Sequence, residues 1–422
     1  MPGGNRFHRS VVASAVALLP ALLSVHGVGA SAVTGAHEAP TRPSLAAATR
    51  CADLHPSTWM GCIAHHDHAF AGTLLSAMAL PGSHDAGTFD LDPTYFDKQS
   101  GSDCTSYTPL FAHVPAVVKR WSQTQNLDFT GQLDTGVRYL DFRIAFTGTE
   151  KGGWRLVHTQ FSRDALVGDV AEIAAWAEAH PSEAVVIDVQ HLCYDNAPTP
   201  ADDAALWADF APLAPVSFDA TSALTPANVA LGQLTGTRGR AHNVVLVLPD
   251  YSVDAPALAA YGVHATFSYP PGSPPGPGGL SPAIPEEYAW PSSVTPTARD
   301  QYSSANEALA QYPQSISPVL GSLQGSGIYQ SQLIYSEDGS NINQLIYLVE
   351  HFSGLIPDTA PGRGPRQAGS APALHAWEAG MWSAEFNRNA AIAAWGSKLN
   401  VVVSDGVEYG GYVPAVVGAN AA

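Results

Sequence analysis

Residues 75–88 read LSAMALPGSHDAGT, an apolar run that ends at a Pro-Gly pair and is followed at once by a histidine and an aspartate. The run predicts a short buried strand, and Pro81-Gly82 predicts the turn after it. His84 and Asp85 then lie directly beyond the carboxyl end of a strand. Taken alone, this pattern is also typical of an ordinary loop histidine beside a turn.

Strand-like and helix-like stretches alternate from residue 51 onward. Short apolar runs predict strands at 75–80, 137–144, 154–157, 184–189, 243–248, 332–335 and 399–403. Apolar residues recur at helical spacing between 166 and 177, and His180-Pro181 ends that helix. Such alternation is typical of a parallel sheet covered by helices, so the expected fold class is α/β.

Polar residues gather at the ends of four predicted parallel strands: His84, Asp85, Asp141, Arg143, His158 and Asp405. In a (β/α)₈ barrel the carboxyl ends of the strands hold the active site. One imidazole can take a proton from an attacking hydroxyl while the other donates one to the leaving oxygen. A guanidinium matches a phosphate in charge and shape, and carboxylates fix histidine tautomers. The set suits phosphodiester cleavage, although each residue singly is also typical of a turn, a cap or a core position.

Composition excludes several classes of partner. The chain has 422 residues, 19 of them Lys or Arg and 37 Asp or Glu, for a net charge of −18. This balance argues against nucleic acid, which is bound through basic contacts to phosphates. It also argues against electrostatic adsorption to an anionic membrane. With 45% hydrophobic residues, a sizeable core is expected. The length fits one large α/β barrel or two ordinary domains. Of these we expect one barrel domain over residues 51–422, as a monomer.

The first residues are typical of an exported protein. Basic residues precede an apolar run over 11–23, and small residues with an A-x-A pattern end at residue 32, so residues 1–32 are predicted to be a secretory signal peptide. Residues 33–50 are predicted to be a flexible leader. Four cysteines fit secretion to an oxidising space. Three pairings are open; one of them joins Cys51 to Cys62 across a short loop and leaves Cys104 with Cys193.

Several blocks of the sequence resemble the phosphatidylinositol-specific phospholipase C-like phosphodiesterases of the X-domain type. The matching blocks are residues 59–60, 80–88 (LPGSHDAGT), 125–144 (QNLDFTGQLDTGVRYLDFRI), 157–158, 169–190 (with HPSEAVVID at 180–188) and 399–420. They cover residues 55–195 well and the C-terminal end thinly. The resemblance implies a distorted TIM (β/α)₈ barrel, a phospholipid substrate and a cyclic inositol phosphate product.

The resemblance also implies a role for each polar residue. His84 is expected to be the general base, His158 the general acid with Asp85 as its partner, Arg143 the group that neutralises the phosphate, Asp141 a supporting carboxylate beside it, and Asp405 the carboxylate that orients the base. Metal-free bacterial members of the family have an arginine where the calcium-dependent branch has an acid. Arg143 therefore predicts a reaction without calcium or any other cofactor.

Two positions that bind the head group in members of the family differ in this chain. Where members use a lysine after the fourth strand, this chain has Gln190-His191, and where they use an arginine after the fifth, it has Pro249-Asp250-Tyr251. Gln190, Tyr288 and Trp290 are the substrate-binding candidates, the two aromatic residues as a stacking surface for a sugar ring. Phosphatidylinositol is the expected substrate, and other phospholipids remain open.

Two other classes of function compete with this interpretation. His65, His66 and His68 form a short cluster that a metal-dependent hydrolase could use, although ligands so close in sequence need a sharp turn to converge. A barrel that binds a lipid or a phosphate without turnover is the other alternative, because fold does not guarantee activity.

Overall fold

A computed structural model describes residues 43–97, 109–113, 115–148, 153–193, 199–219, 228–236, 242–248, 257–266, 286–288, 330–333, 392–393, 396, 399–409 and 411–421. Within these ranges no helix is both long and apolar enough to cross a membrane. The predicted signal peptide lies outside them.

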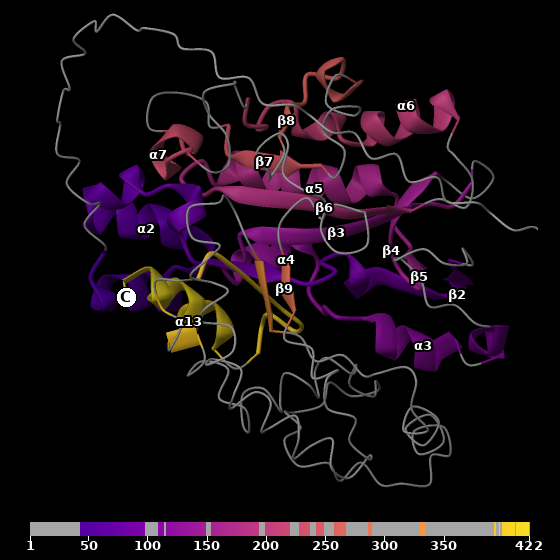
Figure 1. Cartoon of the computed structure of the whole chain (residues 1–422), viewed down its shortest axis with the longest axis horizontal. Helices are drawn as coiled ribbons and strands as arrows, with labels where there is room; N and C mark the ends of the chain where they lie inside the picture. Colours follow the sequence, from indigo (N-terminus) through magenta and orange to yellow (C-terminus); the bar gives the residue numbers. More distant parts are fainter. Residues whose placement is uncertain are drawn as a thin grey trace, which may run out of the picture. The chain divides into compact units, whose positions relative to one another are not determined.

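The centre of the described structure is a set of parallel strands (Figure 1). Eight described strands belong to it: β1 (Leu80–Ser83), β3 (Tyr139–Phe146), β6 (Val185–Cys193), β7 (Val244–Val247), β8 (Ala265–Thr266), β9 (Glu286–Tyr288), β10 (Gln330–Leu333) and β11 (Val401–Ser404). Each strand pairs in parallel with the next one in this series, with one exception. The described residues show no pairing between β8 and β9. The last strand, β11, pairs with the first, β1. This is the strand order of a (β/α)₈ barrel, open between β8 and β9 over the described residues. The α/β class is confirmed.

A small antiparallel ribbon extends from β3. It consists of β4 (Trp154–His158), β5 (Gln160–Ser162) and β2 (Leu91–Phe96), with β4 antiparallel to β3, β5 to β4 and β2 to β5. The prediction that residues 154–157 form a parallel strand is therefore wrong in direction. β3 continues past the residues that pair with β1, and Ile144 pairs with Leu156 on that edge. The returning strand leads His158 back towards the sheet.

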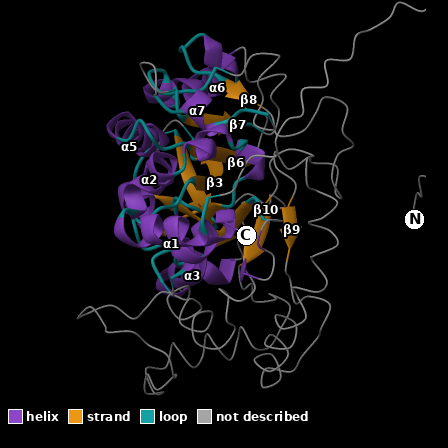
Figure 2. Cartoon of the chain, turned by 90° about the vertical axis from the view of Figure 1, so that its left-hand side faces the viewer, coloured by secondary structure: helices purple, strands orange, loops and turns teal. Residues whose placement is uncertain are grey.

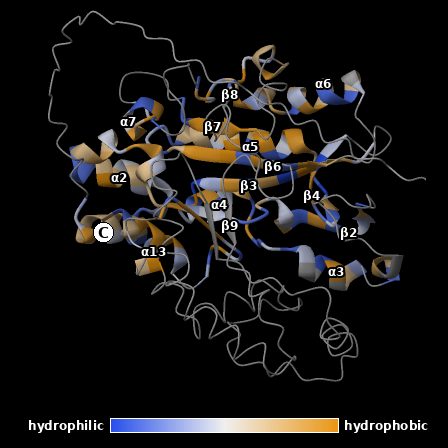
Figure 3. Ribbon diagram, in the orientation of Figure 1, coloured by the Kyte–Doolittle hydropathy of each residue, from blue (hydrophilic) through white to orange (hydrophobic). Residues whose placement is uncertain are grey.

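Helices cover the outer side of the parallel strands (Figure 2). They are α1 (Leu45–Leu54), α2 (Trp59–His66), α4 (Phe129–Asp134), α5 (Leu166–Ala179), α6 (Pro200–Asp209), α7 (Leu231–Leu234) and α13 (Tyr412–Gly418). A further helix, α3 (Pro115–Ser122), packs against β2 and β5 of the ribbon. Short 3₁₀ turns are found at Pro56–Thr58, His68–Gly72, Leu75–Ala77, Thr88–Asp90, Pro109–His113, Ala211–Leu213 and Ala419–Ala421. The helix predicted over 166–177 is confirmed as α5, which buries Leu166, Val170, Ile173 and Ala177. The neighbouring strands β6 and β7 are strongly hydrophobic (Figure 3), as burial on both faces requires.

Two predicted boundaries are wrong. The leader was expected to reach residue 50, yet α1 begins at Leu45, where the Ser44 side chain accepts a hydrogen bond from a backbone N–H of the first turn. This helix is fixed because it buries Ala48 and Cys51, and because Cys51 forms a disulfide with Cys62 of α2. The first strand was expected over 75–80. Residues 75–77 instead form a 3₁₀ turn, and the strand begins where pairing with β11 begins, at Leu80.

Candidate active site

One carboxylate joins three of the predicted site residues. Asp85 follows β1, and its Oδ2 lies 3.3 Å from Nε2 of His84 and 3.3 Å from Nδ1 of His158. Its Oδ1 lies 2.6 Å from Nε of Arg143, which projects from β3. The strand ends of β1, β3 and β4 thus bring a base candidate, an acid candidate and a cation to one acidic side chain.

The fourth strand end supplies a second carboxylate to His84. Asp405 follows β11, and its Oδ1 lies 2.8 Å from Nδ1 of His84. A carboxylate accepts the proton of Nδ1, so Nε2 of a neutral His84 carries the lone pair and faces Asp85. The two imidazole rings of His84 and His158 have centroids 6.3 Å apart.

Asp141 acts on the backbone of Asp85. Asp85 has φ +43°, a left-handed conformation that costs energy for a residue with a Cβ. The Asp85 N–H donates to Oδ2 of Asp141 at 3.2 Å, and the next N–H, that of Ala86, donates to the Asp141 carbonyl oxygen at 2.9 Å. Asp141 was expected to support Arg143. The contacts described here hold the strained turn that aims Asp85.

Exposure separates the residues that a ligand can reach from those beneath them. The side chains of His158 and Arg143 are 26% and 17% exposed, whereas that of Asp85 is 1% exposed. His84 and Asp405 are also nearly covered. Arg143 and His158 therefore present the open face of the site, above a layer of buried carboxylates.

The two histidines have opposite electrostatic environments. Burial alone lowers the pKa of His84, but the charges of Asp85 and Asp405 outweigh it and raise the pKa to about 9. Burial also lowers the pKa of His158, and Asp85 offsets this only in part, while Arg143 adds to it. Near neutral pH the free site therefore holds its imidazole proton on His84.

The carboxylates also differ from one another. Burial raises the pKa of Asp85, but Arg143 and the histidines outweigh it and hold that pKa well below its usual range. Burial, together with the charge of Asp85, raises the pKa of Asp141 to about 6. Asp85 is thus the ionised hub of the site, and its neighbour Asp141 gains a proton in mildly acidic solution.

A β-bulge redirects β6 beside the site. The register between β3 and β6 shifts between Phe142 and Arg143, where Gln190 is the extra residue, and Arg143 then pairs with His191. Bulges next to active sites re-aim side chains. Gln190 is buried, and the charge of His191 helps to lower the pKa of Asp85. Sequence reasoning gave His191 no role of its own, and the bulge is what places it beside Arg143.

The other predicted substrate contacts are less well placed by the structure. Tyr288 is the last residue of β9, where it pairs with Gln332 of β10. Trp290 lies outside the described residues, as do residues 249–251, where the family has an arginine.

A segment that sequence reasoning left without a role completes the site. Residues 122–125 begin at the last residue of α3, and we refer to them as the Ser122–Gln125 segment. The Ser122 carbonyl oxygen lies 2.8 Å from Nδ1 of His158, and Thr124 and Gln125 both donate to the His84 carbonyl oxygen. Gln125 belongs to a block that resembles the family, but side chains that bind backbone leave no periodic signal in a sequence.

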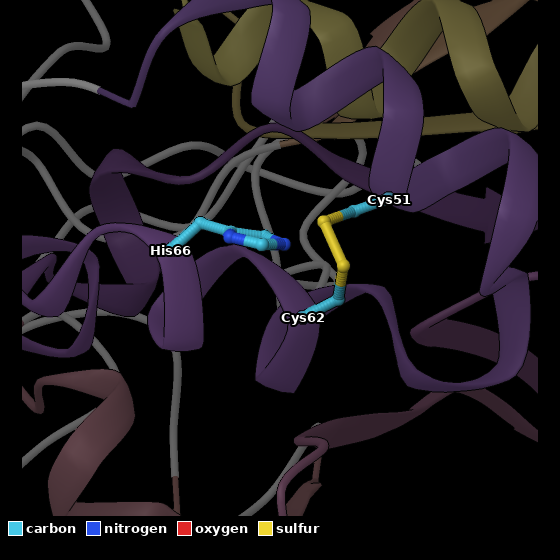
Figure 4. A group of neighbouring side chains, drawn as sticks. All are labelled: Cys51, Cys62 and His66. Atoms are coloured by element: carbon cyan, nitrogen blue, oxygen red, sulfur yellow. A yellow bond between two sulfur atoms is a disulfide. The ribbon is translucent and has the colours of Figure 1, made fainter.

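Ligand atoms for a metal gather in two places among the described residues. Cys51, Cys62 and His66 form one group, but both sulfurs are held in a disulfide and offer no thiolate (Figure 4). The cluster of His65, His66 and His68 does not converge on one point in the structure. Cys193 is also disulfide-bonded; Cys104 lies outside the described residues, so that pairing stays a prediction.

The second group consists of His84, Asp85 and Asp141. It does not fit a divalent cation well, because the Arg143 guanidinium already occupies Oδ1 of Asp85 at 2.6 Å. A cation at that place repels a metal ion and supplies the same neutralising charge.

Known proteins share part of this sequence, although no family model matches it. Over 119 residues the chain is 37% identical to the mouse PI-PLC X domain-containing protein 1. This stretch covers 27% of this chain and 34% of the mouse protein. The human protein of the same name is 38% identical over 119 residues, or 36% of its length. The mouse PI-PLC X domain-containing protein 2 is 30% identical over 156 residues, or 43% of its length. The chain is related to the PI-PLC X-domain proteins.

This similarity confirms the resemblance found in the motifs. It covers only part of each protein. The chain spans well under half of the length of these X-domain relatives. Among solved structures, a variant of phosphatidylinositol-specific phospholipase C from Staphylococcus aureus is 15% identical, with a TM-score of 0.49 over 87% of this chain and 99% of that one. The enzyme of that name from Listeria monocytogenes is 11% identical, with a TM-score of 0.43 over 82% of this chain and 95% of that one.

Proposed function

We propose that this X-domain-related protein is a secreted phosphodiesterase that removes the head group of a phospholipid, with phosphatidylinositol as its substrate. The relationship with PI-PLC X-domain proteins supports phosphodiester cleavage in a lipid. The observation that carries the proposal is the position of Asp85, whose one carboxylate contacts His84, His158 and Arg143. A base, an acid and a group for the phosphate charge therefore lie within a single site.

In the proposed reaction, Nε2 of neutral His84 takes the proton of the inositol 2-hydroxyl, and the resulting oxygen attacks phosphorus. The bond between phosphorus and the diacylglycerol oxygen breaks, and protonated His158 gives its proton to that oxygen. Arg143 neutralises the charge on the phosphate oxygens. One P–O bond forms and one breaks, one proton passes from the hydroxyl to the leaving oxygen, and the products are a cyclic inositol phosphate and diacylglycerol.

The direction of proton transfer depends on how the histidines share one proton. In the free site that proton is on His84, whereas cleavage needs it on His158. A phosphodiester bound beside Arg143 and His158 brings a negative charge that favours the protonated form of His158. Substrate binding thus shifts the shared proton towards the reactive arrangement, as expected for two coupled titrating groups.

Phosphorus NMR of mixed phospholipid vesicles, incubated with the mature protein in excess chelator, tests the reaction. A cyclic phosphodiester signal that appears only with phosphatidylinositol is expected. Cleavage of another lipid instead would leave the assignment of the site residues intact and would change the proposed substrate. Activity that needs added calcium would contradict the role given to Arg143, and no turnover under any condition would favour a binding barrel.

His84→Ala separates an enzyme from a binding barrel. The variant removes the base, so turnover should fall at least about 10³-fold, the size of one acid or base role. Binding of a soluble inositol phosphate, measured by calorimetry, should persist because Arg143 remains. Turnover close to that of the unchanged protein would contradict the assignment of His84.

Export is part of the proposal and has its own test. If residues 1–32 are a signal peptide, the chain expressed with them should accumulate outside the cell. N-terminal sequencing of that material should begin near residue 33. Retention in the cytoplasm with an intact N-terminus would refute this part without affecting the chemistry.

A further inference from the structure

The Ser122–Gln125 segment contacts three separate parts of the chain that carry the active site. Through the Ser122 carbonyl oxygen it holds His158, the last residue of β4. The Thr124 hydroxyl donates to the carbonyl oxygen of His84 at 2.8 Å, and the Thr124 carbonyl oxygen accepts the N–H of Gly406 at 2.9 Å. The segment therefore contacts the end of β4 and the residues that follow β1 and β11.

The hydrogen bonds around Thr124 form a self-consistent network. Oγ1 of Thr88 accepts the N–H groups of Thr124 and Gln125 at 3.0 and 3.1 Å, and it lies 2.6 Å from Oγ1 of Thr124. Thr88 can donate its proton to Thr124, which leaves the Thr124 proton for the His84 carbonyl oxygen. All of these side chains are buried, so the segment is fixed in place.

Gln125 makes the most direct link between the two catalytic strand ends. Its side-chain nitrogen donates to the carbonyl oxygens of His84 and Ser404, each at 3.0 Å. Its side-chain oxygen lies 3.4 Å from the N–H of Val407. Gln125 is fully buried, and both of its amide protons are used.

These contacts lie where the pairing of β1 with β11 ends. Ser83 and Ser404 are the last paired residues, and the His84 N–H donates to the Ser404 carbonyl oxygen at 3.3 Å. The next residues, His84 and Asp405, depend on other contacts for the spacing of their backbones. The Gln125 side-chain amide joins the ends of β1 and β11 at that point, because it donates to the carbonyl oxygens of His84 and Ser404.

We propose that Gln125 is a positioning residue that sets the spacing between the backbones of His84 and Ser404, and thereby the contact between His84 and Asp405. It touches neither the substrate nor the reacting atoms. The kinetic consequence rests on the proposed function, whereas the structural one does not. Without this bridge, the loop after β11 loses the side-chain link that joins it to the His84 backbone, and the 2.8 Å contact lengthens.

The titration of His84 reports on that contact directly. The charged or titratable groups that face His84 are Asp85, Asp405, Arg143, Asp141 and His158. Of these groups, Asp405 is the one that hydrogen-bonds to the His84 ring. It directly follows Ser404, whose carbonyl oxygen accepts a hydrogen bond from Gln125. A longer distance to Asp405 weakens a charge and a hydrogen bond that favour the protonated ring, so the pKa of His84 falls.

The test compares Gln125→Met with Asn400→Leu. Methionine retains most of the side-chain volume and loses the donors. Asn400 is the matched control, because it is a buried amide that donates to two backbone carbonyl oxygens, those of Leu75 and Met78, at the opposite end of β11. The readouts are the pKa of His84 from NMR of histidine-labelled protein, the unfolding midpoint, and kcat and KM on phosphatidylinositol.

Both variants should unfold more easily, but only Gln125→Met should lower the pKa of His84. It should also lower kcat by roughly 10-fold to 100-fold with little change in KM, the scale of a misplaced catalytic group. Unchanged His84 titration and kcat in Gln125→Met would overturn the proposal, as would equal changes in Asn400→Leu. If the unchanged protein cleaves no lipid, the proposed function fails while the NMR comparison still decides the role of Gln125.

Discussion

Nδ1 of His84 lies 2.8 Å from Oδ1 of Asp405, although 321 positions of sequence separate the two residues. The contact exists because the first and last strands of the parallel set are neighbours, with Ser83 paired with Ser404. The two ends of the described domain must therefore be folded together before the base is oriented. The electrostatics of His84 follow from this pairing.

Asp405→Asn should lower both the pKa of His84 and turnover. The substitution removes one of the two charges that raise this pKa to about 9, and an amide can hold the ring in the wrong tautomer. In a comparable histidine–aspartate pair the same change costs about 10⁴ in turnover, and we expect a loss of roughly 10²-fold to 10⁴-fold. NMR titration of His84 and steady-state kinetics measure the two effects.

The control for Asp405→Asn is Asp209→Asn. Asp209 ends α6, and burial raises its pKa to about 6. Its replacement removes one charge from the same protein at a residue outside the site, so the His84 titration and kcat should stay as they are. An equal loss in both variants would show that net charge, rather than the His84 contact, governs turnover.

The rate of cleavage should follow a bell-shaped dependence on pH. At low pH both histidines are protonated and no base is available; this limb lies below the usual histidine value, because the pKa of His158 is lowered. At high pH the pair loses its last proton near 9, the pKa of His84, and no acid remains. The measurement is kcat/KM from pH 5 to pH 10. A rate that still rises above pH 9.5 would contradict the assignment.

The strands β3, β6, β7 and β11 could be predicted from the sequence, because each contains a short run of apolar residues. The strands β8 and β9 were not predicted, because Ala265–Thr266 and Glu286–Tyr288 carry no such run. The direction of β4 could not be predicted either. The residues of β4, WRLVH, have the same pattern as a parallel strand, and only the pairing of Ile144 with Leu156 shows that it returns antiparallel. Strand direction depends on tertiary pairing, which an apolar run does not record.

The charged residues of the site could be predicted for a similar reason. The backbone contacts that hold these residues in place could not. His84 and Asp405 stand out because a polar residue interrupts an apolar pattern. Gln125 acts by binding backbone atoms, and a buried amide that does so has no characteristic spacing in the sequence. Asp141 was predicted as a site residue, but its hydrogen bond to the backbone of Asp85 was not. The left-handed backbone of Asp85 is also invisible there, because its residue type is ordinary for a turn.

Asp169→Asn should stabilise the protein increasingly as the pH rises. Asp169 lies in the first turn of α5, and burial, with the charges of Asp164 and Glu172, raises its pKa to about 8. Since the folded pKa is higher than the unfolded value of about 4, folding favours the protonated form. The stability contributed by that proton is present below pH 4 and is lost between pH 4 and pH 8.

Urea unfolding at pH 5 and pH 8 measures this effect. The gain in unfolding free energy on replacing Asp169 should be about 1–3 kcal/mol at pH 8 and smaller at pH 5. Asp53→Asn, on the exposed side of α1, serves as the control and should show no such pH dependence. An equal gain at both pH values would mean that Asp169 is ionised throughout.

Glu183→Gln should strongly destabilise the fold while leaving the site chemistry in place. Glu183 and Arg138 precede β6 and β3, at the end of the sheet away from the site, and both side chains are fully buried. Oε2 of Glu183 lies 2.7 Å from Nη2 of Arg138, and its oxygens also accept the N–H groups of Met60 and Gly61. Removing the negative charge leaves a buried guanidinium uncompensated, so we expect a loss of roughly 3–5 kcal/mol in unfolding free energy.

Denaturant unfolding of three proteins tests this prediction: Glu183→Gln, Arg138→Met, and the double variant Arg138→Met/Glu183→Leu. The double variant removes both charges and should recover much of the stability that either single change loses, because the cost arises from an unpaired buried charge rather than from the missing attraction. His84 in the surviving folded protein should titrate as before, since Asp85 and Asp405 are untouched. A double variant less stable than both single variants would show that each residue stabilises the fold through contacts of its own, and not by neutralising the charge of the other.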